Sequence, residues 1–345
     1  MAGCLLGLCG CGRQETPAAS APHPEAAAAA PAASPGLASA APLFAPGKLT
    51  SNLLAARTDK DHPALVIDKL NDIGPITFDQ HGAMLILAEM KLADPDAGPG
   101  SHVIEIDSDK KWGVRATTPS QGSALGDDGA RHENYNHFGP LAASPDGSVL
   151  TLFGGTTPAS IDGQGKIDMI PLGIPPAGPT LHTFEEFARD LPNANDWLFD
   201  GITVDQQAMI YLHRSYAEGK KQDEWFQFKA GAMLQKVADK GQLPLDVQAR
   251  IRGDGAELGP DGYLYRIDPV PQSENHFQLV RIGDAGKSSF RKAATVVPLM
   301  ALPPGVSRRS RVSDFEISQP GLAISPGGRL VVYGPDQIFD IQTSP

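Results

Sequence analysis

The chain repeats one short pattern five times between residues 76 and 333. Each copy has a short apolar segment, a polar turn that ends in glycine in all copies but the third, and a second apolar segment. The copies begin at Ile76, Leu141, Ile202, Ala256 and Leu322. Glycine accepts the positive φ of a tight turn, and the second segments are rich in β-branched and aromatic residues. The pattern therefore predicts five β-hairpins.

The spacing of the copies leaves room for two further strands in each repeat. The starts at 76, 141, 202, 256 and 322 are 54 to 66 residues apart, and alternating segments occur at 102–107, 112–117, 223–229, 277–282 and 289–295. A repeat of four antiparallel strands is the blade of a β-propeller. We therefore predict an all-β fold, a β-propeller of five blades, or of six if a long gap hides a degenerate blade. A β-sandwich with recurring hairpins is the alternative.

Two local features qualify this expectation. The last copy has too few residues after it for a whole blade, so we expect the apolar segment 64–68 to complete that blade and close the ring. Residues 183–186 read as a helix capping box, and apolar side chains follow at helical spacing over 184–191. We therefore expect one short inserted helix there, which ends at Pro192.

The first residues resemble a bacterial lipoprotein signal. A short apolar run ends in Leu8-Cys9-Gly10-Cys11, an aliphatic residue three before a cysteine and a small residue directly before it. The resemblance implies cleavage before Cys11 and lipid attachment to that residue. We therefore expect a signal at 1–11 and a protein that is lipid-anchored in the bacterial cell envelope, at the periplasmic face or the outer membrane. An ordinary cleaved signal is the alternative.

The next segment, 12–47, is dominated by Ala, Pro and Ser and has few large apolar residues. It cannot bury enough surface to offset the entropy of ordering, so we expect a disordered tether. The β-propeller domain is then expected at 48–345. All three cysteines lie in the first eleven residues, which leaves that domain without thiolate metal ligands or cysteine nucleophiles.

The formal net charge of −11 argues against nucleic-acid binding, because the neutralisation of phosphates requires a basic surface. Because the signal resembles that of a lipoprotein, we expect membrane contact through the lipid anchor. We expect the partner to be another envelope protein or a polymer. No phosphate-binding loop, dinucleotide motif or nucleophile elbow occurs in the sequence.

Polar residues precede the inner strand of each expected blade, where a propeller would bring them to its central channel. They are Asn71, Asp72, Asn136, His137, Asp200, Asp254 and Glu316. Carboxylates that converge without basic partners repel one another, and a hard cation such as Ca²⁺ would relieve the repulsion. These residues are therefore candidate channel or metal-binding residues. The alternative is that they are ordinary turn residues that face water.

The Pro-Asp-Gly turns after short strands are similar to those of NHL-like propellers and of the regucalcin/gluconolactonase-like family. The resemblance implies a divalent metal in the channel, held by glutamate, asparagine and aspartate. The segment Asp200-Gly-Ile-Thr-Val-Asp205 looks like the aspartate-bearing strand start of that family, which makes Asp200 the implied metal ligand. Where the family has glutamate before Gly-Pro, this chain has Ile73 before Gly74 and Pro75.

Three functions follow from these observations. The first is a binding or scaffold module, and the second is a metal-dependent hydrolase of the lactonase type. The third is a glycosidase that uses channel carboxylates such as Asp72, Asp200, Asp254 and Glu257. The segment from His132 to His137 does not have the spacing of a helical zinc motif, and we interpret it as a polar loop.

Overall fold

A computed structural model describes the part of the chain that forms the repeats. The described residues are 41–56, 65–66, 70–90, 100–118, 123–125, 131–133, 138–153, 157–173, 181–182, 199–217, 220–239, 241, 243–251, 256–273, 276–283, 295–306, 310–312, 315–317, 320–334 and 336–344. All of them belong to one compact unit, Leu37–Pro345. Within these residues no helix is both long and apolar enough to cross a membrane.

Four sheets have the same construction, each with four antiparallel strands in chain order. The first holds β3 (Leu70–Phe78), β4 (Met84–Met90), β5 (Gly100–Ile106) and β6 (Trp112–Thr117). The second holds β9 (Ala142–Ala143), β10 (Val149–Phe153), β11 (Thr157–Ile161) and β12 (Ile167–Met169). The third holds β15 (Gly201–Val204), β16 (Ile210–Ala217), β17 (Lys220–Phe228) and β18 (Gln235–Lys236). The fourth holds β19 (Glu257–Leu258), β20 (Leu264–Pro269), β21 (Phe277–Ile282) and β22 (Val296–Ala301).

The fifth sheet joins the two ends of the repeat region. It holds β25 (Gly321–Ile324), β26 (Leu330–Tyr333), β27 (Gln337–Thr343), β1 (Leu49–Ala56) and β2 (Leu65–Val66). The closing strand is β1, which pairs antiparallel with β27 from Leu49↔Thr343 to Ala56↔Gln337. The segment that we expected to close the ring lies one position further out, because β2 pairs in parallel with β1.

The five sheets form a closed ring. The first strands of neighbouring blades contact one another, β3 with β9 and β25, β15 with β9, and β19 with β25. Four of the junctions between successive blades are each filled by an apolar cluster of their own. The clusters contain Ile104 (fifth to first blade), Val149 (first to second), Leu212 (second to third) and Tyr265 (fourth to fifth). The protein is therefore a five-bladed β-propeller, and the predicted fold class is confirmed.

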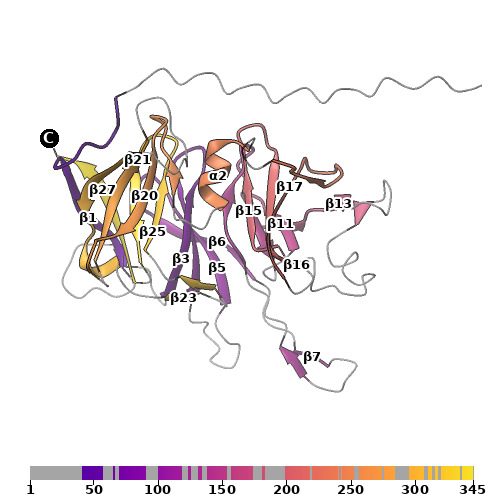
Figure 1. The fold of residues 1–345 in the computed structure, drawn as a ribbon. Helices are drawn as coiled ribbons and strands as arrows, with labels where there is room; N and C mark the ends of the chain where they lie inside the picture. The colour runs from indigo at the N-terminus through magenta and orange to yellow at the C-terminus, as the bar shows by residue number, and fades with distance from the viewer. Residues whose placement is uncertain are drawn as a thin grey trace, which may run out of the picture. The chain divides into compact units, whose positions relative to one another are not determined.

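One described helix, α2 (Leu245–Ile251), fills the remaining junction, and it contacts β15 and β19 (Figure 1). Its buried Val247 packs with the third blade and its buried Ala249 with the fourth. Asp246 in the first turn and Arg250 in the last turn suit the helix dipole. Sequence reasoning missed this helix, and the helix expected at 184–191 lies outside the described residues.

Three two-stranded hairpins accompany the blades. They are β7 (Ser123–Leu125) with β8 (Arg131–Glu133), β13 (Leu172–Gly173) with β14 (Leu181–His182), and β23 (Ser310–Val312) with β24 (Phe315–Ile317). A 3₁₀ turn at Pro304–Val306 follows β22.

The repeated turns share one hydrogen-bond pattern, which explains the sequence pattern. In the first blade, Asp79 N–H donates to Ala83 O, Gly82 N–H donates to Asp79 O, and the Asp79 carboxylate accepts from the N–H groups of His81 and Ala83. Gly82 has a φ of +86°. The same turn in the third blade places Ala208 at a φ of +56°, so the copy without glycine keeps the shared geometry at some conformational cost.

Candidate functional site

The structure describes some of the candidate channel residues completely, some only by their backbone, and others not at all. Asp200 is described with its side chain. Asp72 lies in β3 opposite Glu89, and Glu316 lies in β24 opposite Arg311, but only their backbone pairing is described. His137, Asp254 and the lipidation candidate Cys11 lie outside the described residues. A role of these five residues in a channel or at an anchor therefore stays a prediction.

Asp200 contacts a histidine on the neighbouring strand of its own blade. Asp200 directly precedes β15, and its backbone N–H donates to His213 O at 3.0 Å. This pairing places the His213 ring beside the Asp200 carboxylate, and His213 Nδ1 lies 2.6 Å from Asp200 Oδ1. The histidine side chain is mostly buried, with 16% exposed, whereas the Asp200 side chain is 33% exposed.

A second carboxylate holds the other side of the same imidazole. His213 Nε2 lies 3.1 Å from Asp223 Oδ1, and Trp225 Nε1–H donates to that oxygen at 2.9 Å. The Trp225 ring meets the His213 ring edge to face, with centroids 5.3 Å apart. Burial alone lowers the pKa of His213, but its hydrogen bonds to Asp200 and Asp223 and their negative charges outweigh burial and raise this pKa above its ordinary value.

When His213 is protonated, this cluster is an internal ion pair. A protonated His213 donates from both ring nitrogens, so the cation cancels negative charge that would otherwise accumulate at the start of β15. Among the described residues, no group of three or more histidine, cysteine and acidic side chains is arranged to hold a metal ion. A metal at Asp200 remains a prediction, and it would have to compete with His213 for the carboxylate.

Glu257, the other described carboxylate that we considered for a glycosidase, lies in the short inner strand β19. Its side chain is 19% exposed, and Arg250 Nε of α2 lies 3.5 Å from Glu257 Oε2. Burial raises the pKa of Glu257, and the charge of Arg250 opposes that shift without cancelling it. The nearby Glu257 charge also contributes to the raised pKa of Tyr333, about 12, after the larger effect of burial.

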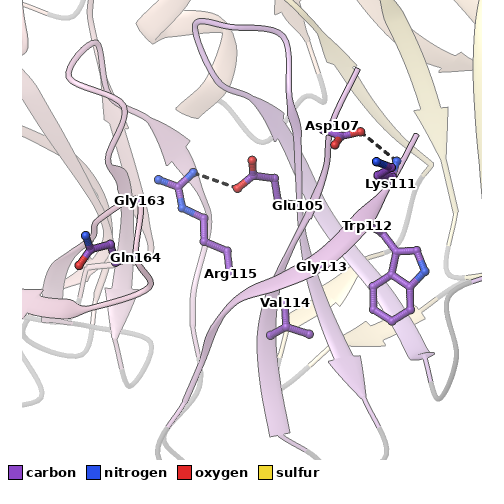
Figure 2. A pocket seen from close by; sticks show the side chains of 9 residues that line it. All are labelled: Glu105, Asp107, Lys111, Trp112, Gly113, Val114, Arg115, Gly163 and Gln164. Atoms are coloured by element: carbon purple, nitrogen blue, oxygen red, sulfur yellow. Dashed lines mark hydrogen bonds and ion pairs between the residues drawn. The ribbon is translucent and has the colours of Figure 1, made fainter. Parts of the chain in front are cut away.

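A pocket of about 380 Å³ lies at the outer edge of the first blade (Figure 2). Strand β6 and the end of β5 form one side, and the turn between β11 and β12 of the second blade forms the other. Both charged and aromatic side chains line it. The lining residues are Glu105, Asp107, Lys111, Trp112, Gly113, Val114, Arg115, Gly163 and Gln164.

Arg115 fixes the two sides of this pocket to each other. Its Nε–H donates to Asp162 O at 3.2 Å and its Nη2–H donates to Gly147 O at 2.7 Å, so it bonds two turns of the second blade. Its Nη1 also lies 3.5 Å from Glu105 Oε2, an ion pair drawn in Figure 2. Only 6% of the Arg115 side chain is exposed. Because buried guanidinium groups require partners, this junction is held in one geometry.

The turn between β11 and β12 packs so closely against β6 that it requires glycine. Gly165 has a φ of +82°, and a Cβ built there would lie 2.0 Å from Arg115 O. The Asp162 carboxylate accepts from the N–H groups of Gln164 and Lys166 and fixes the rest of the turn. Sequence reasoning found the strand 112–117 but missed the pocket, because the pocket depends on the contact between two blades.

Comparisons with known proteins do not identify a family. No protein-family model and no curated protein matches this chain. Solved structures similar to it include a streptogramin B lyase, 12% identical with a TM-score of 0.38, covering 86% of this chain and 98% of that one. A mannose phosphorylase from Leishmania mexicana is 10% identical with a TM-score of 0.34, covering 87% and 89%. A GH43_1 enzyme from Xanthomonas citri is 10% identical with a TM-score of 0.34, covering 80% and 87%. At these scores the likenesses carry no argument about activity.

Proposed function

We propose that this β-propeller is a binding module of the cell envelope and that it binds its partner in the pocket on the first blade. The observation that carries the proposal is the composition and rigidity of that pocket. Exposed apolar surface at Val114, 45% exposed, lies beside the charged Lys111 and the partly exposed Glu105. Such a mixture of an apolar contact with a few fixed polar groups is typical of binding sites.

The rigidity of the pocket favours binding because little entropy is lost when a ligand enters. Arg115 bonds the second blade through two carbonyl oxygens, and Trp112 packs partly against the apolar cluster between the fifth and first blades. A preorganised site of this kind binds without first having to order its own side chains. The lipid anchor at Cys11 and a tether after it complete the proposal, because they would hold the propeller near envelope polymers and proteins. The expected tether at 12–47 is too long at its end, since Phe44 is buried in the fourth-to-fifth cluster beside Tyr265.

The proposal can be tested with the full chain on arrays of envelope saccharides and of short peptides. We expect binding by the wild-type protein and at least a tenfold loss of affinity in Trp112→Ala, which removes the one aromatic side chain among the lining residues. Lys236→Ala is the matched control, since Lys236 is exposed on the outermost strand of the third blade and pairs with Glu224. An equal loss in both variants, or no binding to either array, would refute the proposal. Mass spectrometry of the membrane fraction tests the anchor, and unmodified Cys11 would exclude it.

A further inference from the structure

The backbone of β6 has hydrogen-bonding groups that point away from its own sheet. Asp107 N–H donates to Lys111 O at 3.0 Å, which makes these two residues a hydrogen-bonded pair. Antiparallel pairs alternate, so the next hydrogen-bonded pair is Glu105 with Gly113. The N–H and C=O groups of Trp112 and Val114 therefore point outward, and β6 is the last strand of its sheet.

Among the outermost strands of the four-stranded blades, β6 is the one best suited to accept another strand. The others are short or interrupted: β12 has three residues, β18 has two, and β22 contains Pro298. Short edges and proline are the usual protection against pairing with a further strand. Strand β6 has six residues and no proline.

The pocket provides space beside this edge. Gly113 and Val114 are exposed, and the turn at Gly163 and Gln164 forms the opposite wall (Figure 2). An added strand would lie about 4.8 Å from β6, on the side where the pocket opens. Beyond Val114 the edge is covered, because Gly165 packs against Arg115 O. The free edge of β6 therefore ends at Val114.

Length and charge distinguish between the occupants of such an edge. A second copy of β6 paired antiparallel about Gly113 would need the backbone edge at Arg115, which Gly165 covers, so the edge suits a shorter segment. Lys110 and Lys111 are exposed in the turn before β6, which also contains Asp107 and Asp109. Within the described part of the chain neither ammonium group is in an ion pair, so both can pair with an acidic residue of a ligand.

We infer that the free edge of β6 binds an extended peptide segment as an added strand, with apolar residues against Trp112 and Val114 and acidic residues beside Lys110 and Lys111. This inference rests on the proposed function and names its ligand class. The backbone of residues 112–114 would supply affinity, and the side chains around the pocket would select the sequence.

The test uses the full chain and an array of short peptides that alternate apolar and polar residues, with acidic or basic residues at one end. Val114→Pro removes the outward N–H group, whereas Val114→Thr keeps it with a similar shape. We expect acidic-ended peptides to bind the wild-type protein and Val114→Thr, and Val114→Pro to bind them at least tenfold more weakly. Hydrogen exchange at the amides of Trp112 and Val114 should slow when the peptide is bound.

The outcomes separate this inference from the proposed function. Peptide binding that is equal in Val114→Pro and wild type would overturn the added strand while leaving the pocket as the site. The added strand would also be overturned if the wild-type protein bound a saccharide and no peptide, and if Trp112→Ala lost that saccharide binding. If Val114→Pro does not fold, the double variant Lys110→Glu with Lys111→Glu decides, because it should change the preference from acidic to basic peptides. An unchanged preference would overturn the inference.

Discussion

Asp200 and His213 form a short charged contact at the start of the third blade, with Oδ1 and Nδ1 separated by 2.6 Å. The pair places a titratable cation where the sequence indicated uncompensated negative charge. Because Asp223 holds the other ring nitrogen, the imidazole cannot turn without breaking a hydrogen bond. The Asp200 carboxylate therefore interacts with His213, and this contact should affect both the pH dependence of stability and the binding of Ca²⁺.

The first prediction concerns the pH dependence of stability. The pKa of His213 is raised in the folded protein, so its contribution to stability is complete below the unfolded pKa of about 6.5 and is lost as the pH rises through the folded value. In Asp200→Asn we expect the free energy of unfolding to fall by about 1 kcal/mol at low pH and by less at high pH. Urea unfolding near pH 5.5 and pH 8.5 measures both values. Asp168→Asn, in β12 of the second blade, is the control, and a pH-independent difference for Asp200→Asn would contradict the account.

The second prediction concerns calcium. At pH 5.5, below the ordinary pKa of histidine, a protonated His213 beside Asp200 repels a divalent cation and occupies the carboxylate. At that pH we expect millimolar Ca²⁺ to leave the melting temperature unchanged. Thermal unfolding of the full chain with Ca²⁺ and with EDTA tests this. A rise in melting temperature with Ca²⁺ that disappears in Asp200→Ala would instead support the channel metal site and the lactonase-type function.

The third prediction compares two turn glycines that have nearly the same φ. Gly147 has a φ of +86° and open space at its Cβ position, whereas Gly165 has a φ of +82° and faces Arg115 O. We expect Gly147→Ala to lower the free energy of unfolding by about 1 kcal/mol and Gly165→Ala by about 3 kcal/mol, because the second change also displaces backbone. Denaturant unfolding would measure the difference, and equal losses would show that the contact between the turn and β6 is not tight.

The fourth prediction concerns closure of the ring. Leu54 of β1 is 5% exposed and packs in the cluster between the fifth and first blades, whereas the preceding Leu43 is 40% exposed. We expect Leu54→Ala to lower the free energy of unfolding by about 3 kcal/mol and Leu43→Ala by less than about 0.5 kcal/mol. Similar small effects would mean that β1 adds little to the closed ring.

The hairpins could be predicted from the sequence because their signal is local. The turn that begins at Asp79 needs a side-chain acceptor at its first position and a residue tolerant of positive φ at its fourth, and both appear in the printed sequence. The closing strand could not be predicted in this way. Segment 64–68 is the more apolar candidate, but β1 pairs with β27 along its whole length, and register across such a distance leaves no local trace.

The candidate site was predictable only in part for the same reason. Asp200 was found from its place before an inner strand. Its partners were not, because His213 and Trp225 come opposite Gly201 and each other only through the registers of β15, β16 and β17. The pocket depends on a contact between β6 of one blade and a turn of the next. No spacing within either segment indicates that contact.

The most direct test of the binding function compares two valines that are equally exposed on outermost strands. Val114 on β6 and Val296 on β22 are each 45% exposed. A photo-crosslinking amino acid would replace each in turn in the full chain, in cells that produce the protein. The account predicts a discrete cross-linked partner from position 114 and none from position 296. Adducts of equal yield at both positions, or at neither, would contradict it.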